Sequence, residues 1–594
     1  MPFSEHSKDH VSPLILWGHW FTFINMLLAM LVGSRYLFVH GMPETLLGQF
    51  YMAINLVGHS AFLAFAVYLF VLFPLTFALP FSHILRGVAA VIATAGLTLL
   101  AFDGEIYSHY RLHLNPFLLD IASTDITSLL DSTILAVVPV ALLALQLVIA
   151  NGLWKRLDKV RRKRMGNKVV ALLLSCFVGS HLIHIWADAT GYRPIVAQDK
   201  IFPLHYPATA RTLIQEQGLM DGRELGVLQS SPGDSALLHY PLAPLQCHAE
   251  RTPDVLMVLV EGWRSDMVSA ETMPFLTKLA GQSHWFKRHS AASNQADIGL
   301  YNLLYGMLPN YQEPLALDQS APVLTAQLLA NGYQLNQFGL SINSSNLHWL
   351  SGIEQIASEG DAVTAERDIN VVNSVIATIA NHNQPQVNIV GLRAPADYST
   401  PIGYQGMPTI RADFELNAAQ LVLFNQYRQS LRFIDGQLQR LVAAAGDDTL
   451  LIITGNNGHR FSTDMRASDS NDFSIAATAT PLLIRWPHQP AREINYQTSH
   501  YGLAPALMTQ LLGCTNPSSD YSLGADLYQP NPRPYLVMGN SRAFAVQTDS
   551  ATTVVDNRGD YRMFNHDYQR QSDANLDVQT LLQMMEEGGR FLAQ

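Results

Sequence analysis

Apolar and polar positions divide the chain into a strongly apolar first third and a mixed remainder. Five apolar runs approach the length of about 20 residues that a helix needs to cross the hydrocarbon core of a bilayer: roughly 14–38, 53–79, 87–102, 132–153 and 169–186. The third run is short and reaches that length only with its flanks. The first run is long and lacks a small-residue cleavage site, unlike a removable signal peptide. The pattern predicts five transmembrane helices within residues 1–190.

After residue 250 the pattern becomes that of an α/β protein. Continuous apolar segments, typical of strands buried on both faces, alternate with amphipathic helices. The sequence predicts strands within 254–262, 386–394, 449–458 and 479–487, a helix followed by a strand within 325–340, a helix within 426–446, and a hairpin within 551–565. This alternation predicts a mostly parallel sheet with helices on both faces, and ligands in such folds bind at the carboxyl ends of strands.

Residues 191–250 form the linker between the transmembrane domain 1–190 and the globular domain 251–594. Pro207 followed by ATARTLIQEQ predicts a short helix with Pro in its first turn, closed by Gly218. The free amides of its first turn would point toward Tyr206 and Pro207, and Arg211 would lie just inside the helix.

Charge in the loops predicts the orientation in the membrane. Segment 155–168 contains eight Lys or Arg residues and one Asp, and such basic loops stay in the cytoplasm. Segment 103–131 carries five acidic residues and a single Arg, as expected on the opposite side. Alternating spans then predict a cytoplasmic N-terminus and an extracytoplasmic C-terminal half, which is periplasmic in a bacterium with two membranes.

Composition removes some functions and leaves others open. The net charge of −11 argues against general nucleic-acid binding. The three cysteines, Cys176, Cys247 and Cys514, lack metal-site spacing, and the spacing leaves a Cys247–Cys514 disulfide open. Ionisable residues within or beside the predicted spans either anchor to headgroups or mark a functional site: His19, Arg35, His59, His181, His184 and Asp188.

Spans, a linker and this strand order together resemble the sulfatase/alkaline-phosphatase superfamily, in particular its membrane-anchored members such as lipoteichoic acid synthases and phosphoethanolamine transferases. The resemblance implies an acidic metal ligand after the first strand, a Thr, Ser or Cys nucleophile at a helix N-terminus, and an Asp-His pair after a later strand. In that chemistry the metal neutralises the substrate anion and the helix N-terminus binds it.

The chain departs from the superfamily pattern at the nucleophile and at the Asp-His pair, the positions that the reaction requires. Glu261 in LVEGWRSD is a legitimate carboxylate ligand, but the nucleophile position holds Gln295, and an amide cannot form a phospho-enzyme. The Asp-His positions are Asn456 and Asn457, whose neutral amides bind divalent transition metals poorly. We therefore predict a pseudoenzyme without a metal or other cofactor, in which Glu261 is structural or vestigial.

An enzymatic alternative stays open with a rearranged site. Ser293 lies two residues before the nucleophile position and is the candidate for a displaced nucleophile. A phosphatase or phospho-headgroup transferase would need four side chains to converge: Glu261, Asp297, His459 and His500. His459 is expected to point elsewhere if the loop keeps the superfamily register.

Family-specific strings give a closer resemblance, to the PbgA/YejM (LapC) inner-membrane family. They are WGHWFTFINMLLAMLVGSRYLF at 17–38, LFPLTF at 72–77, ATAGLTLL at 93–100, HLNP at 113–116, IWADATGYRPI at 185–195, YPATAR at 206–211 and YPLAPL at 240–245. The resemblance implies a protein that senses lipopolysaccharide on the outer leaflet of the inner membrane. Through LapB, the family restrains degradation of the deacetylase LpxC by FtsH. Cardiolipin binding and transport is the alternative that the resemblance carries, and some members are described as phosphatases.

The resemblance places the lipid A contact in the linker segment YPATAR. The residues carried over are Tyr206, Pro207, Thr209, Ala210 and Arg211. A helix N-terminus beside a guanidinium independently suits a phosphate monoester. This chain has Thr212 where the family has a second Arg, which implies weaker phosphate binding unless Lys200 or another nearby base substitutes. The alternative is an ordinary linker helix with no lipid contact.

Overall fold

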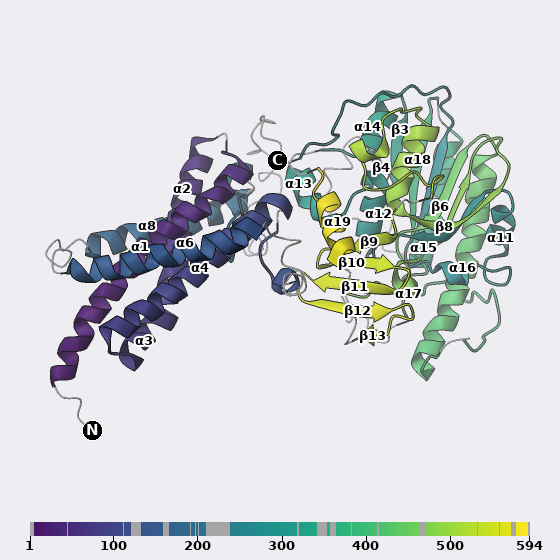
Figure 1. Ribbon diagram of the computed structural model, residues 1–594. Coiled ribbons are helices and arrows are strands. Elements are labelled where there is room, and N and C mark those ends of the chain that lie inside the picture. The colour runs from purple at the N-terminus through teal and green to yellow at the C-terminus, as the bar shows by residue number, and fades with distance from the viewer. Residues whose placement is uncertain are drawn as a thin grey trace. The chain divides into compact units, whose positions relative to one another are not determined.

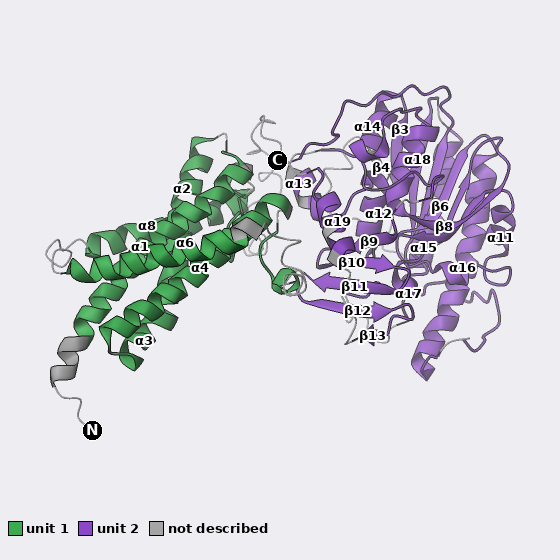
Figure 2. Cartoon of the chain, viewed as in Figure 1, with its two compact units in different colours: residues 1–236, 593–594 green, residues 237–592 purple. Residues whose placement is uncertain are grey.

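The protein forms two compact units, residues 1–236 with 593–594 (unit 1) and residues 237–592 (unit 2), each described below by itself (Figure 2). The computed structural model describes residues 5–43, 45–110, 112–119, 132–157, 166–190, 192–196, 198–199, 201–209, 238–317, 320–340, 353–356, 364–381, 383–412, 415–461, 471–530, 533–556, 559–571 and 578–591.

Unit 1 is a bundle of long apolar helices (Figure 1). They are α1 (Glu5–His40), α2 (Leu46–Val67), α3 (Phe73–Ala78), α4 (Ser82–Tyr110), α6 (Ser132–Lys155) and α8 (Gly166–Thr190), with a π-helical turn at Tyr68–Leu72 that joins α2 to α3. Within the described residues, five segments are long and apolar enough to cross a membrane: Val11–Val39, Leu46–Ala78, Ser82–His109, Leu135–Lys155 and Gly166–Thr190. The five predicted spans are confirmed, and the third does gain its length from its flanks.

Small residues and paired amides hold these helices together. A Cβ added at Gly58 of α2 would lie 2.8 Å from the Cα of Phe177, so glycine lets α2 and α8 approach closely. Between α1 and α6, the Gln146 side chain donates a hydrogen bond of 2.6 Å to Asn25. Because lipid offers no competing partner, such amide pairs fix how neighbouring transmembrane helices are rotated.

Unit 2 is built on an eight-stranded sheet. In chain order its strands are β1 (Val255–Val260), β2 (His284–Ser290), β3 (Gln334–Phe338), β4 (Ile353–Ile356), β5 (Gln386–Leu392), β6 (Leu450–Gly455), β7 (Leu482–Arg485) and β8 (Arg492–Ser499). Their spatial order is β4-β3-β5-β1-β6-β7-β2-β8. Only β7 runs antiparallel to its neighbours, so the predicted mostly parallel sheet is confirmed.

Helices cover both faces of this sheet, which explains why its central strands are apolar throughout. Val255, Met257 and Leu259 of β1 pack into one hydrophobic core, and the alternate β1 residues pack into a second core on the other face. The first core includes α12 (Ala296–Tyr305), α14 (Val323–Ala330) and α18 (Leu503–Gln510); the second includes α11 (Pro274–Ala280), α15 (Thr364–Ile379) and α16 (Ala418–Ala445). The side chains of a strand between two cores point alternately into one core and the other, so none of them faces water.

A smaller antiparallel sheet follows in the chain, with the order β13-β12-β11-β10-β9 (Figure 1). Its strands are β9 (Tyr535–Gly539), β10 (Ala543–Thr548), β11 (Ala551–Asp556), β12 (Tyr561–Asn565) and β13 (Arg570–Gln571), and α19 (Val578–Gly588) follows them. The predicted hairpin at 551–565 is β11–β12. The remaining strands of this sheet were not predicted.

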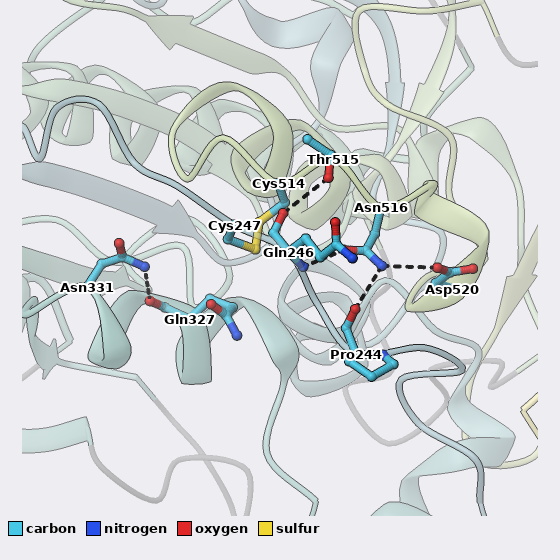
Figure 3. Close-up of a disulfide and its surroundings, with 9 residues drawn as sticks. All are labelled: Pro244, Gln246, Cys247, Gln327, Asn331, Cys514, Thr515, Asn516 and Asp520. Atoms are coloured by element: carbon cyan, nitrogen blue, oxygen red, sulfur yellow. Dashed lines mark hydrogen bonds between the residues drawn. A yellow bond between two sulfur atoms is a disulfide. The ribbon is translucent and has the colours of Figure 1, made fainter.

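A disulfide between Cys247 and Cys514 fastens the start of unit 2 to the segment after α18 (Figure 3). The sequence left this pairing open, and the structure makes it. Backbone hydrogen bonds flank it, from His248 N to Gly513 O at 3.4 Å and from Thr515 N to Gln246 O at 2.9 Å. The chain near residue 247 is therefore held by a short two-stranded contact as well as by the covalent bond.

Candidate functional site

Three adjacent parallel strands bring candidate residues together at their carboxyl ends. The strands β5, β1 and β6 lie side by side, so these ends share one edge of the sheet. Arg393, Glu261 and Asn456 each follow directly on one of these strands. Together with Asp297 from the first turn of α12, they line one pocket. The structure thus joins Glu261 with Asn456 and adds Arg393, which sequence reasoning missed.

This pocket is small because α12 lies against the loop after β6. A Cβ added at Gly299 would lie 1.7 Å from the carbonyl oxygen of Asn456, so only glycine allows the approach. The remaining cavity is about 10 Å³. That space suits about one water molecule, not a phosphate or sulfate ester.

A guanidinium stands beside the carboxylate of Glu261. Arg393 Nη1 lies 3.9 Å from Glu261 Oε2, and Arg393 Nε donates to Asp397 at 3.0 Å. Burial raises the pKa of Glu261, the neighbouring Arg393 opposes that rise, and the nearby Asp397 and Asp297 add to it. Positive charge next to this carboxylate is thus supplied by the protein itself.

Asp368 of α15 fixes the backbone that carries Arg393. One of its carboxylate oxygens accepts hydrogen bonds from the backbone N–H groups of Arg393, at 2.9 Å, and Ala394, at 2.7 Å. Burial raises the pKa of Asp368 to about 7, although the two N–H donors favour the ionised form. This role of Asp368 was not predicted, because it depends on where α15 packs.

The two asparagines at the Asp-His positions have different surroundings. Asn457 is a structural clamp: its Oδ1 accepts from Gly262 N at 3.0 Å, its backbone oxygen accepts from Trp263 N at 2.9 Å, and its Nδ2 donates to Asn294 O at 3.4 Å. Asn456 lines the pocket, and its buried Oδ1 has no hydrogen-bond partner within the described part of the chain. Asn457 is absent from the pocket lining.

The nucleophile position and its neighbour do not present a hydroxyl to the pocket. Gln295 is the N-cap residue of α12, and its side chain makes no capping hydrogen bond. Ser293 is fully buried, and its Oγ accepts from the backbone N–H of Gln295 at 3.1 Å. Neither residue lines the pocket. Ser293 therefore serves the turn before α12, and the displaced-nucleophile alternative has no support in the geometry.

His459 lies in an aromatic cluster and not at the pocket. Its Nε2 is 2.6 Å from the hydroxyl of Tyr398, and its ring stacks on Tyr427 with a centroid separation of 5.0 Å. Burial lowers its pKa to about 4. A neutral imidazole enclosed by aromatic rings contributes packing at this position.

His500 is committed to a buried hydrogen-bond chain. Thr498 Oγ1 lies 2.9 Å from His289 Nδ1, His289 Nε2 lies 2.9 Å from His500 Nδ1, and His500 Nε2 lies 3.0 Å from Gly455 O. Because the last group can only accept, each link donates toward Gly455. Burial lowers the pKa of His500 to about 4. Both of its ring nitrogens are used, which leaves no lone pair for a metal.

The residues at the strand ends do not fit the divalent metal that the superfamily implies. Glu261 and Asp297 reach the pocket, but Arg393 neutralises one of them and both histidines are engaged elsewhere. Over the described ranges, no three His, Cys, Asp or Glu side chains are grouped so that they could hold a metal ion. The four side chains of the enzymatic alternative do not converge.

The linker segment carried over from the resemblance is anchored to α8 through its backbone. Ala208 O lies 2.8 Å from His184 Nδ1, and Ala208 N donates to His181 Nδ1 at 3.4 Å. The other nitrogen of His184 lies 2.5 Å from Asp199 Oδ1. Tyr206, two residues before Ala208, is 83% exposed.

The predicted linker helix is only partly testable. Tyr206, Pro207 and Thr209 lie in a segment without helical structure, so the expected helical turn at Pro207 is wrong. The tertiary hydrogen bonds at Ala208 replace the local bonds of a helix there. Ala210, Arg211, Thr212 and the expected end at Gly218 lie outside the described residues.

Further buried polar contacts surround this segment and the ends of α1 and α4. His59 Nε2 lies 2.8 Å from Pro203 O, and burial lowers the pKa of the adjacent His205 to about 4. Arg35 pairs with Glu105 at 2.5 Å. Asp103 accepts from Tyr36 at 2.6 Å and lies 2.7 Å from His113. Sequence reasoning noticed several of these ionisable residues but not their partners, which are distant along the chain.

Comparisons with known proteins cover almost all of the sequence. Residues 4–247 match the domain of unknown function DUF3413, and residues 253–514 match the sulfatase family. The chain is 31% identical to the inner membrane protein YejM of Salmonella typhimurium over 602 residues, covering 99% of each protein. It is 30% identical to an uncharacterized protein of Haemophilus influenzae, covering 95% of this chain and 94% of that one.

Solved structures that the chain resembles include two bacterial proteins. A protein of the alkaline phosphatase superfamily from Vibrio parahaemolyticus has a TM-score of 0.45 and 14% identity, covering 63% of this chain and 98% of that one. The phosphonate monoester hydrolase of Agrobacterium radiobacter has a TM-score of 0.45 and 16% identity, covering 56% and 94%. With the sulfatase-family match, the predicted sulfatase-like fold is confirmed.

Proposed function

The chain belongs to the YejM family of inner membrane proteins, and from that premise we propose that it senses lipid A at the periplasmic leaflet and regulates lipopolysaccharide synthesis. In this proposal it controls the stability of LpxC through a LapB-type partner and FtsH. The lipid contact comprises Tyr206, Pro207, Thr209, Ala210, Arg211 and Thr212, and the sulfatase-like domain is catalytically inactive.

The anchoring of Ala208 to the last span carries this proposal. The backbone N–H and C=O of Ala208 are bound by His181 and His184 of α8, so the linker segment lies near the end of a transmembrane helix. Tyr206, two residues before Ala208, is exposed, and an exposed Tyr near the end of a transmembrane helix suits a membrane interface. Arg211 follows closely in the sequence and supplies the charge that a lipid phosphate requires.

The proposed orientation has support from two independent features. The basic segment 155–168 favours a cytoplasmic loop before the last span, which leaves the following residues in the periplasm. The Cys247–Cys514 disulfide in unit 2 fits an oxidising compartment, whereas cytoplasmic thiols stay reduced.

Catalytic inactivity is supported by what occupies the strand ends. Arg393 supplies positive charge next to Glu261, Asn457 is bound to Gly262 and Trp263, and the pocket has space for about one water. The enzymatic alternative would need each of these contacts to be remade.

Lipid content of the purified protein tests the sensing proposal. Full-length protein is solubilised in mild detergent, and the lipids that remain bound are quantified by mass spectrometry. We expect Arg211→Ala and His184→Phe to reduce bound lipopolysaccharide about tenfold, the effect of losing one charge-assisted hydrogen bond. Arg251→Ala, an exposed Arg of unit 2, is the matched control. Unchanged lipopolysaccharide in both variants contradicts the proposal, and selective loss of cardiolipin favours the lipid-transport alternative.

Regulation is tested in cells with the same variants. Arg211→Ala is expected to change the steady-state level of LpxC while LapB still co-purifies with the protein. Equal LpxC levels in wild type, Arg211→Ala and Arg251→Ala would separate lipid binding from regulation and defeat the second half of the proposal.

Elemental analysis and a phosphoesterase assay test inactivity. We expect less than stoichiometric Mn, Mg and Zn in wild-type protein and the same background hydrolysis in wild type and Glu261→Gln. One bound metal per chain together with hydrolysis that Glu261→Gln abolishes would establish the enzymatic alternative.

A further inference from the structure

A second pocket of unit 2 lies on one face of the small antiparallel sheet, away from the strand ends described above. Residues that pair across antiparallel strands point to the same face. Val554 of β11 pairs with Arg562 of β12, and Phe564 of β12 pairs with Arg570 of β13, the three strands that lie side by side in Figure 1. These four residues therefore share one face, and all line a cavity of about 120 Å³.

The opposite wall comes from the segment after β6 and is tied to the sheet by Tyr568. The Tyr568 hydroxyl accepts from Phe473 N at 2.7 Å and donates to Asn471 O at 3.2 Å. The Tyr568 ring stacks on Phe564 with a centroid separation of 4.2 Å and an interplanar angle of 3°. The backbone of Tyr568 has φ of 58°, a conformation that an aromatic residue rarely adopts, so surrounding contacts must hold it. The aromatic pair is thus a fixed part of the wall.

Charged groups of both signs converge on this aromatic wall. Arg562 and Arg570 are exposed, and neither forms an ion pair with any carboxylate in the ranges that the structure describes. Arg460 is paired with the buried Asp472. Other acceptors at the pocket are the carboxylates of Asp556 and Asp560. The lining thus offers guanidinium donors and carboxylate acceptors together.

This mixture discriminates between classes of ligand. A simple anion needs donors and would be repelled by the carboxylates, and a purely apolar ligand would leave the guanidinium groups unpaired. A sugar ring presents hydroxyl groups that both donate and accept, and C–H faces that pack against aromatic rings. The cavity of about 120 Å³ is about twelve times as large as the strand-end pocket of about 10 Å³, which suits one sugar ring and not an extended chain.

We propose that the pocket between Arg460, Arg562, Arg570 and Tyr568 binds one pyranose ring of a saccharide. Hydroxyl pairs on the ring are held by the guanidinium and carboxylate groups, and one face of the ring lies on the aromatic pair. This site is separate from the linker segment and does not depend on the proposed lipid sensing.

Ligand-observed NMR on full-length protein in detergent tests the assignment. The probes are D-glucose, N-acetylglucosamine and D-glucuronate, with inorganic phosphate as the competitor. We expect at least one pyranose to bind with millimolar or tighter Kd, and Arg562→Gln to weaken it at least tenfold because a bidentate contact is lost. Arg542→Gln is the matched control, since Arg542 is an exposed Arg in the turn between β9 and β10, outside the pocket lining. It should leave the Kd unchanged.

Three results would overturn the proposal. The first is that none of the three sugars binds. The second is that Arg562→Gln and Arg570→Gln, both at exposed positions and expected to fold, leave sugar binding unchanged. The third is that inorganic phosphate displaces the sugar at equal concentration, which would make the pocket a simple anion site.

Discussion

Replacing both Cys247 and Cys514 by serine should destabilise unit 2 without changing its fold. The disulfide joins residues 267 positions apart, so it closes a loop that includes most of the unit. When the bond is removed, the backbone hydrogen bonds on either side, at His248 and Thr515, still align the two segments. The native arrangement should persist, and the unfolded chain should gain freedom.

The size of the effect follows from the length of the closed loop. For this separation, loop-closure entropy corresponds to about 5 kcal/mol at 25 °C, an upper bound because unfolded chains keep some structure. Unfolding entropy scales with chain length, and for a unit of about 350 residues a loss of that size lowers the melting temperature by about 7 °C.

Intrinsic fluorescence during heating measures the change on purified full-length protein. The double Ser variant should melt about 7 °C below wild type, and reductant should shift wild type toward the variant while leaving the variant unaffected. Cys176→Ser is the matched control, because Cys176 is a free cysteine in α8. Thiol titration in denaturant should find one free thiol in wild type before reduction and three after it.

Two outcomes would refute this reasoning. Three reactive thiols in unreduced wild type would show that the bond does not form. A double variant that melts at the wild-type temperature, with the bond shown to be present in wild type, would show that closing this loop contributes nothing to stability.

Three further experiments probe the strand-end site. Gly299→Ala should cost about 3 kcal/mol in urea unfolding, since the added Cβ would lie 1.7 Å from Asn456 O, and a wild-type midpoint would contradict the contact. Asp368→Asn should flatten the pH dependence of the melting temperature. The pKa of Asp368 in the folded protein is about 7, above its ordinary value. Wild type therefore loses stability as the pH rises from about 4 through 7. Equal slopes of melting temperature against pH for wild type and Asp368→Asn would contradict this. Arg393→Gln and Glu261→Gln should couple by about 1 kcal/mol in a double-mutant cycle, more at pH 8 than at pH 5, and additive effects at both pH values would contradict the ion pair.

Local pattern was enough to predict the spans and the main strands. The central strand Val255–Val260 is apolar at every position because both of its faces are covered, and that property is visible in the sequence. Glu261 and Asn456 were assigned from the superfamily resemblance, and their proximity agrees with the rule that residues after adjacent parallel strands meet at one edge. Arg393 obeys the same rule and was available to the same reasoning.

Contacts between distant segments were beyond that reasoning. The disulfide and the Asp368 bonds depend on how helices and loops pack, which no local spacing records. The helical turn expected at Pro207 was wrong for a related reason, since two histidines more than twenty residues away along the chain bind the backbone of Ala208. Tertiary hydrogen bonds decided the conformation there, whatever the local preference.

The hydrogen bonds of Asn457 hold the loop after β6 against the residues that follow β1. Histidine at position 457 would match the superfamily pattern. It would also remove the amide oxygen that now accepts a hydrogen bond from the Gly262 N–H. Aspartate at position 456 would add a third carboxylate to the pocket that Glu261 and Asp297 already line. Either substitution alone would remove a hydrogen-bond acceptor or add a buried charge, so the two amides stabilise the present arrangement of this edge of the sheet.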